Sequence, residues 1–201
     1  MSLGLAIDLG SSGRQFPGIL SLDREAIPGA QVCDIRLGLP FGQTTVDIVV
    51  SSHCLAHLHP FHELPRVLEE IQRVLKPGGL LRVAIPDLTK LVSAYTAPDS
   101  ALAVDLAKTQ QELGDYVGMP YEKMPLALKF SAICFGDNSG SAAYDGHRWC
   151  GDFETLKWFL EQTGFADVQA CKYGESRHPT LMQTYQDTGA AEEIIVEAVK
   201  P

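Results

Sequence analysis

Short apolar segments alternate with polar turns along the first half of the chain. Four of these segments are rich in Ile, Val and Leu and end near Gly, Asp or Ser; they cover residues 5–9, 19–23, 31–35 and 46–52. Continuous apolar runs of this length are typical of parallel strands that are buried on both faces. The pattern therefore predicts the first half of an α/β sheet.

An amphipathic helix is predicted to follow near Pro65, a residue that is tolerated in the first turn of a helix. Its apolar stripe has helical spacing and contains Leu64, Val67, Leu68, Ile71, Val74 and Leu75, opposite the solvent-facing Glu69, Glu70 and Arg73. The helix is expected to stop at Lys76-Pro77, and Gly78-Gly79 can take the positive φ that reverses the chain. A buried strand over residues 80–86 should come next.

Helices and strands continue to alternate in the second half of the chain. Asp87 is placed to cap a short helix through Tyr95, and Asp152 to begin a helix that Gly164 closes. Between them we expect a helical stretch over residues 99–113, then a region rich in Gly, Pro and aromatic residues. The last two strands are expected at residues 168–173 and 193–200. Such alternation predicts a doubly wound open sheet.

The composition indicates one domain and limits its partners. With 201 residues and 45% apolar content, the chain can bury one sizeable core, so we expect a single domain over residues 1–201 with an embedded lid at 96–149. A net charge of −9, without a run of Lys or Arg, disfavours nucleic acid and anionic membranes. The start lacks the pattern of a secretory signal and no apolar window could span a bilayer, so we expect a cytoplasmic protein.

Neither the cysteines nor the clustered histidines predict a metal site or a disulfide framework. The five cysteines lie singly at positions 33, 54, 134, 150 and 171, which is typical of free thiols in a reducing compartment. His53, His57, His59 and His62 lie within ten residues, and an i,i+4 pair is a known ligand spacing. However, no Glu follows the first histidine and Pro60 interrupts the run, so we predict no metal.

Polar residues lie at the carboxyl ends of the predicted strands. An open α/β sheet binds its ligands just beyond these ends. The residues are Asp8-Leu9-Gly10-Ser11-Ser12, Asp23, Asp34 and Ser51-Ser52-His53, after the first to fourth strands in turn. A dinucleotide would need a glycine-rich loop that opens onto a helix, and residues 14–18 leave no room for one. Acids that only cap strand-to-loop turns are the other interpretation.

Several of these motifs belong together in one known family. The stretch from Ile71 to Gly79, with the strand after it, closely resembles the junction of fourth helix and fifth strand in class I S-adenosylmethionine-dependent methyltransferases. Leu39-Pro40-Phe41 and Ser51-Ser52-His53-Cys54-Leu55-Ala56-His57 are similar to a small subgroup that lacks much of the first helix. Two departures are Ser12, where the family's acid-x-Gly-x-Gly signature has its second glycine, and Ala56, where the subgroup usually has Glu.

The resemblance implies a fold, a cofactor and site residues. The fold is a Rossmann-like doubly wound sheet of seven strands in the order 3-2-1-4-5-7-6, with the last strand antiparallel and a lid inserted after the fifth. Asp8 and Gly10 then line the methionine end of S-adenosylmethionine, and Leu9, Ser11 and Ser12 complete that loop. Asp23 takes the ribose and Asp34 lies near adenine. The cofactor is faced from the fourth strand by Ser51, Ser52 and His53.

A dedicated base is optional in methyl transfer, because the donor is already activated and positioning supplies much of the acceleration. If the acceptor must lose a proton, His53 and His57 are the first candidates and His147 from the lid is the next. A purely structural role for these histidines is the alternative. The mixed polar and aromatic run over residues 144–149 is the expected acceptor-facing loop.

The leading hypothesis is methyl transfer from S-adenosylmethionine to an unidentified small molecule, with a homodimer as a further expectation. The rival is a non-catalytic module that binds S-adenosylhomocysteine or a protein partner, and Ser12, Ala56 and the missing first helix favour it. A nucleotide-dependent oxidoreductase is third.

Overall fold

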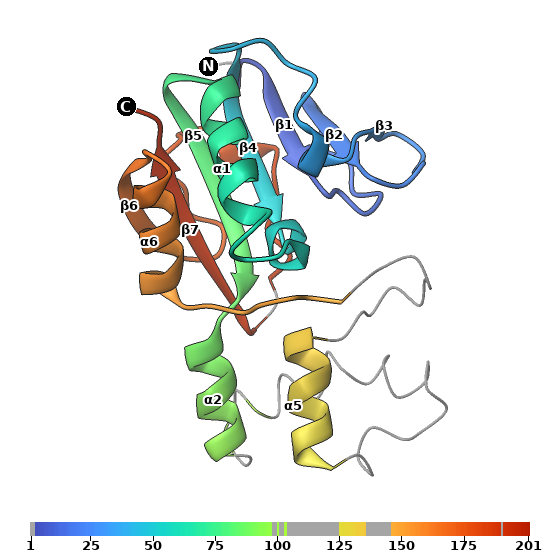
Figure 1. The fold of residues 1–201 in the computed structure, drawn as a ribbon, viewed down its shortest axis with the longest axis vertical. Helices are drawn as coiled ribbons and strands as arrows, with labels where there is room; N and C mark the ends of the chain where they lie inside the picture. The colour runs from blue at the N-terminus through green and yellow to red at the C-terminus, as the bar shows by residue number, and fades with distance from the viewer. Residues whose placement is uncertain (1–2, 98–99, 101–102, 104–124, 136–145, 190) are drawn as a thin grey trace.

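A seven-stranded sheet runs through the centre of the protein in the order β3-β2-β1-β4-β5-β7-β6 (Figure 1). The computed structural model describes residues 3–97, 100, 103, 125–135, 146–189 and 191–201. Its strands are β1 (Ala6–Leu9), β2 (Ile19–Asp23), β3 (Gln31–Val32), β4 (Val46–Ser52), β5 (Leu75–Pro86), β6 (Ala166–Cys171) and β7 (Glu193–Val199). The first five pair in parallel, and β7 is antiparallel to both β5 and β6. The predicted fold class and strand order are confirmed.

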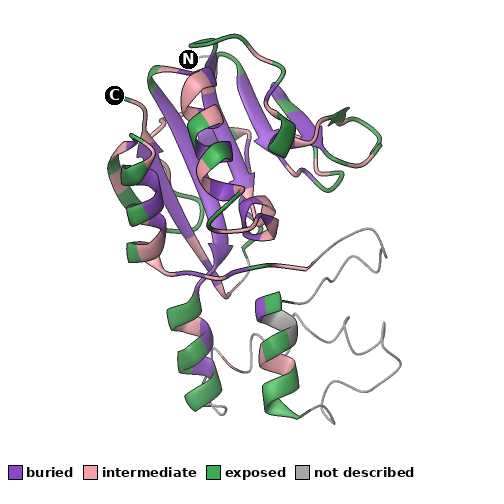
Figure 2. Cartoon of the chain, viewed as in Figure 1, coloured by how far each residue is buried: buried purple, intermediate pink, exposed green. Residues whose placement is uncertain are grey.

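Two helices, α1 (Leu64–Val74) and α6 (Phe153–Gln162), cover one face of the sheet. Each buries only the side that faces the strands, whereas the central strands are buried along most of their length (Figure 2). The predicted stripe of α1 is buried, and Asp152 caps α6 by accepting a hydrogen bond from the Thr155 N–H at 2.8 Å. Both helices form where the apolar spacing and the caps predicted them.

The opposite face of the sheet is covered by the segment that joins β6 to β7, residues 172–192, with its short helix η4 (Leu181–Gln183). Leu181 and Tyr185 pack there on apolar side chains of β1, β2, β4 and β5. The Tyr185 ring lies 4.8 Å from that of Phe16, and the Arg14 guanidinium lies 5.1 Å from the Phe16 centroid. Among described residues 10–18 there is no helix, as the sequence predicted. The segment between β6 and β7 therefore covers the sheet face beside residues 10–18, where there is no helix.

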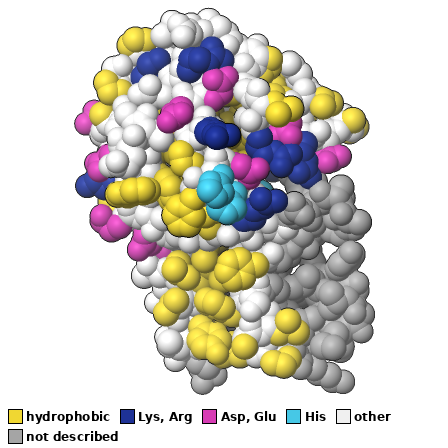
Figure 3. All heavy atoms as spheres, viewed as in Figure 1, with side chains coloured by type: hydrophobic (Ala, Val, Ile, Leu, Met, Phe, Trp, Pro, Cys, Tyr) yellow, Lys and Arg dark blue, Asp and Glu magenta, His cyan; other side chains and the backbone are white. Residues whose placement is uncertain are grey.

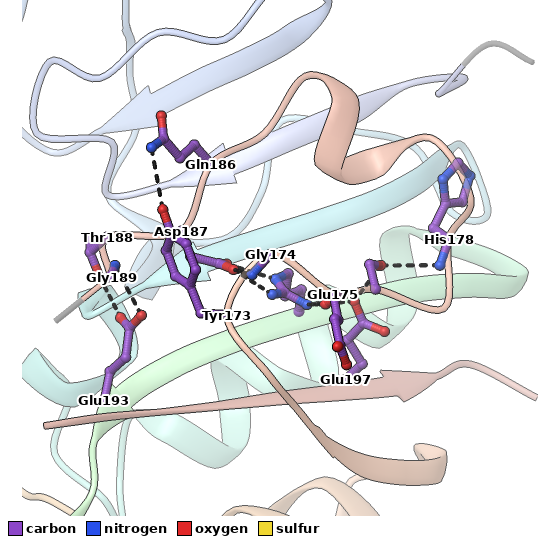
Figure 4. A network of polar contacts seen from close by, with 12 residues as sticks. Tyr173, Gly174, Glu175, His178, Gln186, Asp187, Thr188, Gly189, Glu193 and Glu197 are labelled. Carbon is purple, nitrogen blue, oxygen red and sulfur yellow. Dashed lines mark hydrogen bonds and ion pairs between the residues drawn. The ribbon is translucent and has the colours of Figure 1, made fainter. Parts of the chain in front are cut away.

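A buried arginine fastens this covering segment to the sheet through Asp187 and Glu197, two acids that Figure 4 labels. The side chain of Arg82, on β5, is 2% exposed and forms ion pairs at 2.7 Å with Asp187 and with Glu197 of β7. Asp187 also accepts a hydrogen bond from the Gly174 N–H at 3.0 Å. Burial of these charges is tolerated because each has oppositely charged and hydrogen-bonded partners.

Three predicted strands differ from the observed ones by two or more residues. β3 ends at Val32, because Asp34 accepts a hydrogen bond from the Arg36 N–H at 3.0 Å and so begins the short helix η1 (Ile35–Leu37). β5 begins at Leu75, which pairs with Val46 before a shift in register, so the Lys-Pro-Gly-Gly run lies inside the strand as an irregularity. Gly78 there has φ +76°. β6 starts and ends two residues earlier than predicted.

Two helices, α2 (Leu88–Thr96) and α5 (Leu126–Phe135), lie side by side beyond the carboxyl end of β5 (Figure 1). Tyr95 and Phe130 join them, with ring centroids 5.2 Å apart. Asp87 caps α2 as predicted, whereas α5 was not predicted. Apolar side chains gather on the visible face of this pair (Figure 3); the exposed ones are Leu88, Val92, Tyr95, Leu126, Leu128 and Phe135.

Most of the helix predicted at residues 99–113 lies outside the described residues, and so do three of the six aromatic residues of the predicted lid, Tyr116, Tyr121 and Tyr144. The lid as a unit over residues 96–149 thus remains a prediction. In the part of the chain that the structure describes, no helix has the length and apolar character needed to cross a bilayer.

Candidate active site

A pocket opens at the carboxyl edge of the sheet, at the point between β1 and β4 where the strand order reverses direction. It contains about 780 Å³ of space free of protein atoms, a volume that includes open solvent at its mouth. The predicted site residues that line it are Gly10, Ser12, Asp23, Asp34, Ser52, His53 and His57. The structure thus brings the tips of four strands together around one cavity.

The loop after β1 closes the pocket with its backbone. Gly10 has φ +69° and donates its N–H to the carbonyl of Leu22 at 2.9 Å. A Cβ at Gly10 would lie 2.6 Å from the Sγ of Cys54, so only glycine fits there. Ser12 has φ +48°, the left-handed conformation that glycine adopts most readily. The serine that departs from the family signature therefore takes up a glycine-like backbone conformation.

Two carboxylates face this cavity, and backbone donors hold both. Asp23, 2% exposed, accepts hydrogen bonds from the N–H groups of Ser12 at 2.9 Å and Glu25 at 3.0 Å. Asp34 forms an ion pair with Arg36 at 2.6 Å, and its side-chain hydrogen bond with Arg36 lowers the pKa of the carboxyl below its usual value. The pocket therefore offers fixed hydrogen-bond acceptors at the ends of β2 and β3.

Four predicted cofactor residues do not line the pocket: Asp8, Leu9, Ser11 and Ser51. Leu9 lies in the main core, and the hydroxyls of Ser11 and Ser51 are buried without a hydrogen-bond partner among the described residues. Burial raises the pKa of Asp8 to about 7, although Arg14 opposes the shift. Any contribution of these four to a ligand would come from behind the wall of the pocket.

All three histidines predicted as bases come together beside the end of β4. His53 follows the strand with φ +60°, and its ring stacks on that of His147 with centroids 5.7 Å apart. The rings of His147 and His57 are 4.7 Å apart. The arrangement is held by two hydrogen bonds to η2 (Cys54–His57), from the Arg148 N–H to the Ala56 carbonyl and from the Trp149 indole to the Leu55 carbonyl. Residues 146–149 are thereby fixed against the short helix that follows β4.

Sequence reasoning missed several charged groups at the site. The carboxylate of Glu193, the first residue of β7, lies 3.4 Å from Nε2 of His53. Two arginines, Arg24 and Arg36, line the pocket as well, together with Arg148 from the run that was predicted to face the acceptor. Nothing in the local sequence marks Glu193, because only the pairing of β7 with β5 brings it to this edge of the sheet.

At the pocket, the described side chains support neither thiol chemistry nor a bound metal. Burial raises the pKa of the Cys54 thiol, which lines the pocket, to about 12, so it stays protonated and a poor nucleophile. Ala56, where the subgroup usually has Glu, lies buried in the core and does not line the pocket. Within the described ranges, no three His, Cys, Asp or Glu side chains converge as metal ligands would.

The sequence profile of the family described as "Methyltransferase domain" matches residues 16–83. The chain is similar in structure to an S-adenosylmethionine-dependent methyltransferase of Thermotoga maritima. The TM-score is 0.50 and the identity 17%, and the match covers 98% of this chain and 83% of that one. It is also similar to human N-acetylserotonin methyltransferase, which was solved with S-adenosylmethionine. Here the TM-score is 0.52 and the identity 17%, and the match covers 99% of this chain and 48% of that one. The chain carries the class I methyltransferase fold. The fold implied by the resemblance is thus confirmed, and the family profile matches residues 16–83, while the smaller subgroup stays a prediction.

A curated relative covers only part of the chain. Human mitochondrial arginine-hydroxylase NDUFAF5 is 34% identical over 88 residues, which are 44% of this chain and 23% of that protein. The mouse protein of the same name is 35% identical over the same length. The chain therefore spans about a quarter of the length of these relatives, so the likeness concerns one part of the methyltransferase fold.

Proposed function

We propose that this protein transfers the methyl group of S-adenosylmethionine to a small-molecule acceptor. The observation that carries the proposal is the buried carboxylate of Asp23, which faces the pocket from the end of β2 and is held there by the Ser12 N–H. A fixed acceptor at this place suits a ligand with ribose hydroxyls. The methyltransferase fold and the family match support the same conclusion.

The residues that line the pocket fit this cofactor. In the proposal, the backbone of Gly10 and Ser12 lies against its methionine end, Asp23 accepts from the ribose hydroxyls, and Asp34 lies near adenine. Ser52 and His53 face it from the end of β4. Asp8, Leu9, Ser11 and Ser51 support this loop from behind. Among residues 10–18 no helix N-terminus is available for a pyrophosphate, which disfavours a dinucleotide.

The cofactor supplies a methyl group that its sulfonium already activates. The chain contributes a cavity that orients the two reactants and excludes water, and such positioning supplies much of the acceleration. The cluster of His53, His57 and His147 can hold the proton that an acceptor loses. The acceptor would enter beside this cluster, where residues 146–149 pack on η2.

Partners and location are part of the same proposal. The net charge of −9 supports a small acceptor over a nucleic acid or an anionic membrane surface, and a cytoplasmic location suits five free cysteines. A homodimer is retained as a proposal.

Calorimetric titration tests the proposal. The wild-type protein should bind S-adenosylmethionine and S-adenosylhomocysteine in the micromolar range and should not bind NAD. Asp23→Ala should lose at least about tenfold in affinity, since a buried hydrogen-bond partner is worth 1.4 kcal/mol or more. Glu161→Ala, on the exposed side of α6, is the matched control and should bind as the wild type does.

The rival functions predict different results. An interaction module that has lost the cofactor would bind neither sulfur compound at millimolar concentration. A module that only binds S-adenosylhomocysteine would retain that binding, but it would form no S-adenosylhomocysteine from S-adenosylmethionine with any acceptor in a broad screen. Binding of NAD alone would favour an oxidoreductase and overturn the proposal.

A further inference from the structure

His53 and Glu193 form a pair that nothing in the family resemblance assigns. Nε2 of His53 lies 3.4 Å from Oε2 of Glu193. The imidazole lines the pocket, whereas the Glu193 side chain behind it is only 4% exposed. A buried carboxylate behind a partly exposed imidazole is the arrangement in which an acid orients a base.

The carboxylate of Glu193 is itself held in place from a second direction. Its Oε1 accepts a hydrogen bond from the Gly189 N–H at 3.1 Å, and its Oε2 accepts one from the Thr188 hydroxyl (Figure 4). The backbone of Glu193 is fixed as well, because it pairs with Pro86 of β5 and its carbonyl accepts from the ammonium of Lys90 at 2.6 Å. The carboxylate therefore has a defined position from which to act on His53.

Charge complementarity then decides which ring nitrogen of His53 carries the proton in the neutral state. A carboxylate accepts hydrogen bonds only, so Nε2 must be the protonated nitrogen to face Oε2 favourably. Nδ1 is then left with its lone pair and can take a proton. We propose that Glu193 is the positioning residue of this site, which holds His53 as the Nε2–H tautomer so that Nδ1 receives the proton lost by the methyl acceptor.

The catalytic part of this assignment rests on the proposed function and makes that function more specific. It defines the acceptor as a group with an O–H or N–H proton to lose. That proton moves to Nδ1 as the acceptor gains the methyl group, and the resulting imidazolium is stabilised by the Glu193 carboxylate until the proton passes to water.

The decisive variant is Glu193→Gln. The Gly189 N–H requires an oxygen at the Oε1 position, so the amide nitrogen of the new side chain must take the Oε2 position and donate toward His53. The same hydrogen-bond geometry therefore predicts a reversal: His53 should change from the Nε2–H to the Nδ1–H tautomer. Nitrogen-15 NMR of histidine-labelled protein above pH 8 reports the tautomer directly, and His53→Gln identifies the His53 signals among the six histidines.

Glu197→Gln is the matched control, because it removes another buried carboxylate from the same strand and one that pairs with Arg82. It should leave the tautomer of His53 unchanged. With an acceptor from the screen, Glu193→Gln should lower kcat by about 10² to 10⁴, the range for losing a correctly oriented base, while S-adenosylhomocysteine binds within about twofold of wild type.

The outcomes separate the two proposals. A wild-type His53 found as the Nδ1–H tautomer overturns the positioning role, and that measurement needs no variant to fold. A tautomer that does not change in a folded Glu193→Gln protein also overturns it. If neither sulfur compound binds the wild type while the tautomer reverses as expected, the proposed function fails and the assignment of Glu193 to the orientation of His53 stands.

Discussion

The backbone N–H of Ser12 donates a hydrogen bond of 2.9 Å to the carboxylate of Asp23, and so ties the loop after β1 to the end of β2. This bond uses the main chain of Ser12 and not its hydroxyl. The departure from glycine at this position therefore leaves the connection between loop and pocket acid intact.

Ser12→Gly should alter the loop very little. Glycine adopts φ +48° without the cost that an L-residue has there, which is about 1–2 kcal/mol, but it also gains entropy in the unfolded chain. The two effects oppose each other, so the free energy of unfolding should change by less than about 1 kcal/mol. Urea denaturation and titration with S-adenosylhomocysteine check both stability and affinity.

Ser12→Val is the contrasting variant. A β-branched residue is strongly disfavoured at positive φ, so it should lower the free energy of unfolding by about 1–3 kcal/mol and weaken binding by shifting the N–H that Asp23 needs. If valine were as stable as glycine, the left-handed conformation of this loop would be disproved.

The ion pairs of Arg82 should be essential to stability. Arg82→Met leaves the carboxylates of Asp187 and Glu197 buried without their cation, which should cost about 3–5 kcal/mol of unfolding free energy. Lys76→Met, the control, removes a partly exposed pair with Asp47 and should cost no more than about 1 kcal/mol. Chemical denaturation of the wild type and the two variants at one pH measures these free energies. Equal losses in Arg82→Met and Lys76→Met would contradict the buried network.

Asp8 should make the protein less stable as the pH rises from about 4 to 7. Its folded-state pKa is raised to about 7 by burial, so between these values the folded chain keeps a proton that the unfolded chain has released. Stability from this group is therefore greatest at low pH and is lost toward pH 7, by at most about 4 kcal/mol.

Asp8→Asn removes that dependence. The advantage of the variant over the wild type should be absent near pH 4, grow up to pH 7 and stay constant above it. Urea denaturation at several pH values from 4 to 8 measures the difference. An advantage that shrinks with rising pH would show that the folded protein lowers the pKa of Asp8, and one that does not change with pH would show that the pKa is not shifted.

Cys150 should be a reactive thiol near neutral pH. A hydrogen bond with Cys134 lowers the pKa of Cys150 to about 7, and the two side chains meet where α5 packs against the segment before α6. Alkylation of Cys150 should therefore become faster between pH 6 and 8, and Cys134→Ala should move that rise to higher pH. Mass spectrometry of the alkylated peptide identifies the site, and an unchanged pH profile in Cys134→Ala would refute the thiol pair.

Local patterns predicted much of the fold because most of its strands and helices have an apolar pattern that is visible in their own residues. β4 and α1 were found from a run of apolar residues and from a stripe at helical spacing. β3 was overestimated, since the capping of η1 by Asp34 competes with a strand over the same residues. The strand order came from the family resemblance, because pairing between distant strands leaves little trace in local sequence.

The sequence predicted those site residues that lie at the end of a strand, because the local chain alone fixes their position. Asp23 is the last residue of β2 and His53 follows β4 directly, and both line the pocket. Glu193 was missed because it reaches His53 only through the antiparallel return of β7, and the opening residue of a last strand has no distinctive pattern. The segment at residues 172–192 was missed for a similar reason: it covers the sheet with isolated side chains, not with a periodic apolar stripe.

That covering segment sets an order of events for a chain synthesised from its N-terminus. Ala6 and Ile48 are covered by Leu181 and Tyr185, and the Arg14 guanidinium donates to the carbonyl of Gln186. β1 and β4 therefore leave the ribosome long before the residues that shield them exist. Until then one face of the nascent sheet stays open to water and to other chains, so the first strands to be made are among the last to be completed.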